Sequence, residues 1–221
     1  MKSARGWVCA GLTLLCVTLR GQAPQIPTAI PGQAPPVDLS GYWSPVLHED
    51  LMERGAGSEL ADYGGFPLNE AGRLWALSYD ASRVTLRHHQ CEAYLAPYQM
   101  RALGNFRIWE ERDEHTQRLL AIHIWAQTTE GHRIVWMDGR SHPPAWAPHT
   151  FRGFSTGQFV GTALVVRTTH MKGGALRRGN GVPQSDQATL TEFFVRHGDH
   201  LTNVTAVTDP VFLSEPIVRS N

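Results

Sequence analysis

Cysteine is scarce in this chain: three of 221 residues, at Cys9, Cys16 and Cys91. The first two lie in an N-terminal segment that we predict to be removed, which leaves Cys91 alone in the mature domain. A single cysteine cannot form an internal disulfide, so the hydrophobic core must hold the domain together. Because Cys91 follows His88 and His89, a nucleophilic thiol is one interpretation, but a buried, inert thiol is the common case.

The chain also lacks an excess of charge of either sign. Its 20 Lys and Arg residues balance 20 Asp and Glu residues, so the formal net charge at pH 7 is +0. Domains that bind nucleic acids carry clustered basic residues, so we predict no nucleic-acid partner. The sequence has no His-Glu-x-x-His or Cys-x-x-Cys spacing, no phosphate-binding loop and no dinucleotide fingerprint. We therefore predict no cofactor and no bound metal.

Long hydrophobic runs are missing as well. The N-terminal run, Trp7 to Leu19, has about thirteen mostly apolar residues, whereas a helix that spans a bilayer needs about 20. Lys2 and Arg5 precede it, and a basic start before a run of this length is typical of a secretion signal. We predict that residues 1–23 are such a signal and that the protein is periplasmic or secreted. Membrane contact is then expected only through an uncleaved signal.

Behind the predicted signal, residues 24–37 are rich in proline and carry no charge, which indicates a linker rather than part of a core. No internal repeat or second linker follows, so a single domain is expected over residues 38–221. The best helix pattern covers residues 68–82, where apolar residues recur near a spacing of 3.6 and Asn69 is placed to cap the start.

Short runs rich in Val, Ile, Thr, Phe and Trp follow one another after about residue 104. Turn segments such as "ERDEHTQ" and "HGDH" separate these runs. Tight turns join antiparallel neighbours, whereas parallel strands need long crossovers, so we predict antiparallel pairing. With "GYWSPV" as the first strand, about eight strands are expected. The prediction is a mainly β fold, an antiparallel barrel or strongly curved sheet with one or two helices packed on it.

The tripeptide Gly41-Tyr42-Trp43 resembles the Gly-x-Trp motif that opens lipocalin-type barrels. Longer segments resemble a family of exported bacterial proteins of unassigned function, over about residues 38–218. They include "DLSGYWSPVLHEDL", "VWMDGRSHPPAWAPHTFRGFSTGQFVG", "LVVRTTHMK" and "RRGNGVPQSDQATLTEFFVRHGDHLTNVTAVTDPVFLSEP". The resemblance implies export and a lipocalin-like sheet, and it supplies no reaction. Where such proteins are expected to carry an acidic Glu-Gly-Asp, this chain has residues 160–162, "VGT", so a role for that acid is absent.

Two neighbouring strands carry the most suggestive pair of side chains. In "TALVVRTTH", alternation puts His170 on the more apolar face of its strand, so it is expected to point inward at one end of the barrel. In "ATLTEFFVRH", the inward face is ambiguous. If Leu190 and Phe194 face inward, Glu192 lies between them and needs a partner or a raised pKa. One glycine-rich connection joins the two strands, so we expect them to be neighbours.

That connection contributes two further candidates. Arg178, which follows Arg177, has the forked donors that suit a carboxylate or phosphate ligand. Asp186 lies just before the strand of Glu192, where it is able to orient a histidine by accepting its ring N–H. The alternative is a solvated loop in which neither residue has such a role.

A proline-stiffened segment, residues 138–149, is expected to cross one end of the barrel. It holds four candidate ligand-binding residues, and rigid placement is what a binding site needs. The alternative is that its histidines only bond the backbone. The spacing Gly153-x-Ser155-x-Gly157 matches a nucleophile elbow by letter, but strand rather than helix follows, so we reject it. The four candidates are Arg140, His142, Trp146 and His149.

Two functions are compatible with these patterns, together with a structural role without a pocket. The first is a module that binds a small, partly apolar molecule in a β-barrel pocket, with a small-molecule ligand as its partner. The second is a hydrolase, lyase or isomerase in the same pocket, with His170 as general base or acid and Glu192 or Asp186 orienting it. Because no catalytic motif is present, binding is the favoured interpretation and enzymatic activity stays open.

Overall fold

The computed structural model describes residues 34–46, 65–79, 93–101, 104–129, 131–177 and 181–221. Four features of the sequence analysis lie outside them: the predicted signal, most of the predicted linker, the cysteine and histidines at 88–91, and the candidate Arg178.

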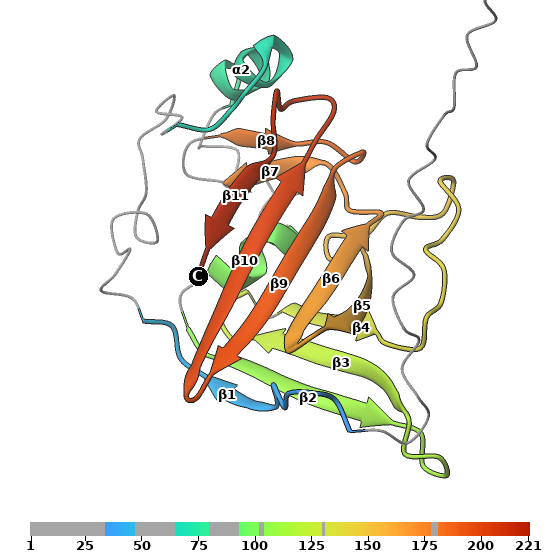
Figure 1. Cartoon of the computed structure of the whole chain (residues 1–221). Coiled ribbons are helices and arrows are strands. Elements are labelled where there is room, and N and C mark those ends of the chain that lie inside the picture. The colour runs from blue at the N-terminus through green and yellow to red at the C-terminus, as the bar shows by residue number, and fades with distance from the viewer. Residues whose placement is uncertain (1–33, 47–64, 80–92, 102–103, 130, 178–180) are drawn as a thin grey trace, which may run out of the picture.

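A nine-stranded sheet that curls into a half-barrel dominates the fold (Figure 1). The prediction of a mainly β protein built on a strongly curved sheet is confirmed. The order of the strands leaves β1 and β11 at the two edges. In this order the strands are β1 (Gly41–Trp43), β2 (Phe106–Arg112), β3 (Leu119–Ala126), β4 (Gly131–Trp136), β5 (Phe154–Val160), β6 (Ala163–Thr169), β9 (Thr189–His197), β10 (His200–Thr208) and β11 (Ile217–Ser220).

One pair of neighbouring strands departs from the predicted antiparallel pairing. Strands β4 and β5 run parallel, with Val135 opposite Ser155 and Trp136 opposite Thr156. The physical reason is the long proline-bearing segment between them, residues 137–153, which we call the crossover loop. Parallel neighbours need a connection of about a dozen residues or more, and this loop supplies it. The other neighbouring strands of the large sheet pair in antiparallel fashion.

The glycine-rich connection between β6 and β9 forms a second, two-stranded sheet rather than a simple turn. It consists of β7 (Gly174–Arg177) and β8 (Val182–Gln184). The predicted helix is present as α2 (Glu70–Leu77), shorter than the predicted range, and it contacts β8. Asn69 caps it as expected, since its Oδ1 accepts a hydrogen bond of 2.9 Å from the backbone N–H of Gly72.

A short 3-10 helix, η3 (Ala96–Arg101), connects distant parts of the sheet. The side-chain amide of Gln99, which is fully buried, donates to the carbonyls of Ile124 at 3.2 Å and Gly131 at 2.8 Å, on β3 and β4. The same helix contacts β10 and β7. It therefore packs against the inner face of the sheet and places Met100 and Arg101 near the gap between the edge strands. No helix in the described ranges is long and apolar enough to cross a bilayer.

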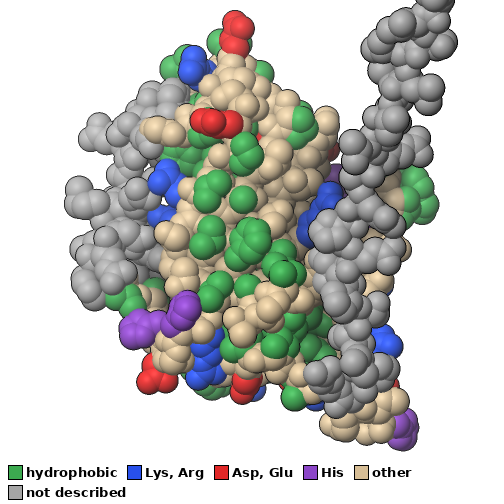
Figure 2. Space-filling view, in the orientation of Figure 1, with side chains coloured by type: hydrophobic (Ala, Val, Ile, Leu, Met, Phe, Trp, Pro, Cys, Tyr) green, Lys and Arg blue, Asp and Glu red, His purple; other side chains and the backbone are tan. Residues whose placement is uncertain are grey.

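Alternation along the strands separates the core from the outer face. On β9, Leu190, Glu192 and Phe194 are fully buried, whereas Phe193 between them is 39% exposed. Hydrophobic side chains gather among polar ones on the outer face over β9 and β10 (Figure 2). The core inside the curve is built mainly from Leu39, Met100, Phe106, Ile108, Ile122, Ile124, Ala126, Val135, Leu164, Val166 and Phe194.

Candidate functional site

The structure brings three of the predicted histidines together at the base of the crossover loop. His142 contacts the hydroxyls of Thr169, at 2.7 Å from Nδ1, and Thr156, at 2.8 Å from Nε2. Thr169 Oγ1 also lies 2.7 Å from Nδ1 of His170. The rings of His149 and His170 meet edge to face with centroids 5.1 Å apart. We call these residues the histidine cluster.

One carbonyl determines the protonation pattern of the cluster when its imidazoles are neutral. Nε2 of His170 lies 2.9 Å from the carbonyl oxygen of Pro144, which only accepts, so Nε2 must donate. Nδ1 of His170 then accepts from the hydroxyl of Thr169, and that oxygen is left to accept from Nδ1 of His142. Nε2 of His142 in turn accepts from Thr156. The ring nitrogens of both histidines are thereby used within the cluster.

His149 keeps one ring nitrogen available. Its Nδ1 donates to the carbonyl of Met171 at 3.0 Å, which leaves the lone pair on Nε2, for which the described residues supply no hydrogen-bond partner. The pKa of His142 lies below its ordinary value because burial disfavours the imidazolium, and the charges of Arg167 and His170 act in the same direction. The cluster therefore uses both ring nitrogens of His142 and of His170, and Nε2 of His149 is its one ring nitrogen without a hydrogen-bond partner among the described residues.

The backbone explains why His170 does not continue the inward face of β6. The strand ends at Thr169, and His170 adopts a left-handed conformation with φ of 56°. This conformation turns the side chain out of the alternation of the strand and toward the crossover loop.

Glu192 lies inward between Leu190 and Phe194, and its partner is Arg133 rather than a histidine. The guanidinium of Arg133, on β4, holds both carboxylate oxygens at 2.5 and 3.0 Å, and both side chains are at most 1% exposed. Strands β5 and β6 separate β4 from β9 in the sheet, so this ion pair ties non-adjacent strands together inside the curve. The strands of His170 and Glu192 are neighbours, but no carboxylate of the described chain hydrogen-bonds His170.

The remaining candidates lie near the surface. Asp186 is exposed, and its neighbour Ser185 is the residue held by a buried acid, Asp209, through backbone and hydroxyl bonds of 2.6 and 2.7 Å. Arg140 forms an ion pair with Asp138 and lies over the ring of Trp136 at 3.5 Å. Trp146 is 85% exposed.

A second cluster of ionisable side chains was not identified from the sequence. On the outer face of β2, β3 and β4, Nε2 of His123 lies 2.8 Å from the carboxylate of Glu111, and its Nδ1 lies 2.8 Å from Nε2 of His132. The indole of Trp109 is stacked on His123 with centroids 4.9 Å apart. The sequence holds information that predicts part of this cluster: the alternation of side chains along the strands and the lengths of the two hairpins put Trp109 opposite His123.

Hydrogen bonding gives this Glu111–His123–His132 chain a direction. The carboxylate accepts from His123, so neutral His123 accepts in turn from His132, whose Nδ1 is left as the proton acceptor at the exposed end. The pKa of His132 is lowered by burial and, to a smaller extent, by the charge of His123. Among the described residues, no group of three or more His, Cys, Asp or Glu side chains is placed to hold a metal ion.

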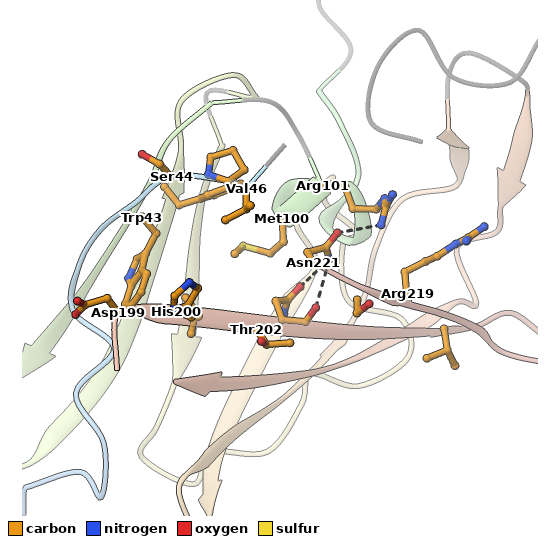
Figure 3. A pocket seen from close by; sticks show the side chains of 16 residues that line it. Trp43, Ser44, Val46, Met100, Arg101, Asp199, His200, Thr202, Arg219 and Asn221 are labelled. Carbon is orange, nitrogen blue, oxygen red and sulfur yellow. Dashed lines mark hydrogen bonds between the residues drawn. The ribbon is translucent and has the colours of Figure 1, made fainter. Parts of the chain in front are cut away.

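A cavity lies elsewhere, in the gap between the two edge strands (Figure 3). Its volume is about 830 Å³. None of the predicted site residues that the structure describes lines it. Its walls come from β1 and the residues after it, η3, the start of β2, the β9–β10 hairpin and β11. The side chains used below are Trp43, Met100, Arg101, Phe106, Asp199, His200, Leu201, Asn203 and Arg219.

The cavity follows from the open architecture of the sheet. A closed barrel would pair β1 with β11, whereas here each has one neighbour, β2 and β10 respectively. The last residue, Asn221, extends the pairing of β11 through two backbone bonds with Asn203, of 2.8 and 2.9 Å. The gap is lined by polar groups of β10 and β11 together with residues of the hydrophobic core.

No family model, curated protein or solved structure matches this chain. Function must therefore be argued from the geometry of these three regions: the histidine cluster, the Glu111–His123–His132 chain and the cavity.

Proposed function

We propose that the protein is exported and binds a small, partly apolar molecule in the cavity between β1 and β11. The observation that carries this proposal is the cavity itself, with its volume of about 830 Å³. Pockets for small molecules measure roughly 300–1,000 Å³ and combine apolar walls with a few polar groups. Export rests on the N-terminal sequence pattern, and the family resemblance is consistent with it.

The walls of the cavity have the composition that such a ligand requires. Trp43, Met100, Phe106 and Leu201 belong to the hydrophobic core or pack against it, so a ligand that contacts them leaves water. Asn203 adds a buried amide to the lining. Removal of apolar ligand surface from water supplies the affinity, and polar groups of this kind set the orientation.

The enzymatic alternative has less support. Its catalytic pair needs an imidazole within hydrogen-bond reach of a carboxylate in a shared pocket. Glu192 is instead occupied by Arg133, and His170 by a hydroxyl and a carbonyl. Both residues lie outside the lining of the cavity. We therefore propose binding and not catalysis for this site.

The test is a titration of the purified full chain with Nile red, an uncharged dye that fluoresces in apolar surroundings. The expected result is saturable binding of one dye per chain. Replacing Leu201 with Trp adds a large ring to the cavity and is expected to weaken binding by about tenfold or more.

The matched control is Val160→Trp, which adds the same ring on β5 at a residue that is 49% exposed and outside the cavity. This variant should bind the dye as the parent does. The proposal is contradicted if Nile red does not bind saturably, or if both variants change binding equally.

A further inference from the structure

The cavity is uneven in charge along its length. Figure 3 shows Arg101 and Arg219 toward one side and Trp43, Asp199 and His200 toward the other. Asp199 and His200 are exposed, whereas both arginines are half-buried. Water screens charges at an exposed rim more strongly than charges at a covered wall. The two arginines therefore lie on the better covered side of the cavity.

Hydrogen-bond donors accumulate on this arginine side. Nη1 of Arg101 donates to Oδ1 of Asn221 at 3.0 Å, and Nδ2 of Asn221 donates to Oδ1 of Asn203 at 3.2 Å. Asn203 is only 1% exposed, and its own Nδ2 has no hydrogen-bond partner in the part of the chain that the structure describes. Buried amide nitrogens normally have a hydrogen-bond partner, so this nitrogen is available to donate to a water or to a ligand atom.

The chemistry of these donors restricts what that group is. A guanidinium has N–H donors and no acceptor, and the unpartnered nitrogen of Asn203 is also a donor. A ligand atom placed here must therefore accept, and beside two cations an anionic oxygen is favoured over a neutral one. An ammonium group is disfavoured for the same reasons.

The rest of the wall defines the other half of the ligand. Met100 and Phe106 are buried core residues, and Leu201 and Trp43 pack against the same core. A hydrocarbon chain or ring that starts at the arginine side can extend along these residues toward Trp43 (Figure 3). Such a ligand keeps its charge at the donors and buries its apolar part.

We propose that the cavity selects an amphipathic anion, with a carboxylate or phosphate group against Arg101, Arg219 and the Nδ2 of Asn203 and an apolar body that reaches Trp43. This inference rests on the proposed binding function and adds the chemical class of the ligand.

The test is displacement of Nile red from the full chain at pH 7.5 by a series of ten-carbon compounds. Decanoate is expected to displace the dye at about tenfold lower concentration than decan-1-ol, because a hydrogen bond to a charged group adds roughly this factor. Decyltrimethylammonium should displace least. Decyl phosphate, compared with decanoate, tells which of the two anionic groups fits better.

Single variants identify the residues responsible. Arg219→Gln and Arg101→Gln should each lose most of the preference for decanoate over decan-1-ol, measured as the ratio of the two displacing concentrations for the same variant. Arg167→Gln is the control: it removes the same charge from an exposed position on β6 outside the cavity and should keep the preference. Because both compounds are compared on the same variant and the circular dichroism of each variant is recorded, loss of folding is distinguished from loss of selectivity.

The outcomes separate the two proposals. Absence of saturable Nile red binding to the parent chain overturns the binding function and this inference with it. Saturable dye binding with equal displacement by decanoate and decan-1-ol, or strongest displacement by the ammonium compound, overturns the inference alone. An equal loss of preference in Arg167→Gln and Arg219→Gln also overturns it, since net charge would then explain the effect.

Discussion

At the base of the crossover loop, the ring nitrogens of His142 and His170 all have hydrogen-bond partners, supplied by Thr169, by Thr156 and by a backbone carbonyl. In the cavity, by contrast, the buried Asn203 keeps an amide nitrogen that no described residue satisfies. The two regions lie toward opposite ends of β9, since β6 near the loop pairs with the start of β9 and the cavity includes the β9–β10 hairpin. Polar groups that satisfy each other stiffen a fold. A buried polar group without a protein partner beside a cavity is available to a water or to a ligand atom.

The largest expected effect on stability concerns the interior ion pair, which lies in neither of the two regions. Glu192→Gln leaves the buried guanidinium of Arg133 without its counter-charge, and such a loss costs about 3–5 kcal/mol. Urea denaturation followed by circular dichroism should show this decrease in the free energy of unfolding.

The matched control for the ion pair removes both charges. The double variant Arg133→Met/Glu192→Leu should recover most of the lost stability, because apolar residues of similar size replace a buried pair at little cost. If the free energy of unfolding of Glu192→Gln stays within about 1 kcal/mol of that of the parent, the ion pair does not hold the non-adjacent strands together as we describe.

A smaller effect is expected in the histidine cluster. Thr169→Val keeps the shape of the side chain but removes the hydroxyl between His142 and His170, so about 1–2 kcal/mol of stability should be lost. Nile red binding should be unchanged, since the cluster is separate from the cavity. Thr191→Val, on β9, makes the same replacement at a hydroxyl that hydrogen-bonds no described residue, and it should be nearly neutral. Reduced dye binding in Thr169→Val would show that the two regions are coupled.

The smallest effect concerns pH. The pKa of His142 and of His132 is lowered in the folded state, mainly through burial, so the unfolded chain binds protons more readily. The stability that depends on these neutral imidazoles is fully present above about pH 6.5, the unfolded pKa, and is lost as the pH falls through the folded pKa values. Urea midpoints measured from pH 8 to pH 5 should be flat at first and then fall.

The double variant His132→Asn/His142→Asn identifies the source of that fall. Its urea midpoints should decrease less between pH 7 and pH 5 than those of the parent chain. A decrease of the same size in both proteins would assign the pH dependence to other groups.

Features set by local sequence were predictable from the residues. Asn69 caps α2 where expected, and the alternation around Leu190 and Phe194 left an inward Glu192 as one of two options. The partner of Glu192 was not predictable, because Arg133 reaches it across two intervening strands. Such a contact depends on the curvature of the whole sheet, and the alternation of side chains along a strand does not predict that curvature.

The sequence prediction placed the pocket at the crossover loop, whereas the described cavity lies between the two edge strands. The histidines and prolines of the crossover loop are conspicuous in the sequence, but the loop serves as the crossover between parallel strands and its histidines bond to nearby hydroxyls and carbonyls. The cavity depends on which strands remain unpaired at the edges. It also depends on η3, whose Arg101 belongs to no sequence motif that would mark it as a site residue.

The most direct measurement is a titration of the isotope-labelled full chain with decanoate, followed by nuclear magnetic resonance. Trp43 and Asn203 line the cavity, so their indole and side-chain amide signals should shift together and saturate. The ring signals of His142, His149 and His170 should stay in place. Shifts confined to those three histidines, with Trp43 and Asn203 unaffected, would contradict the account.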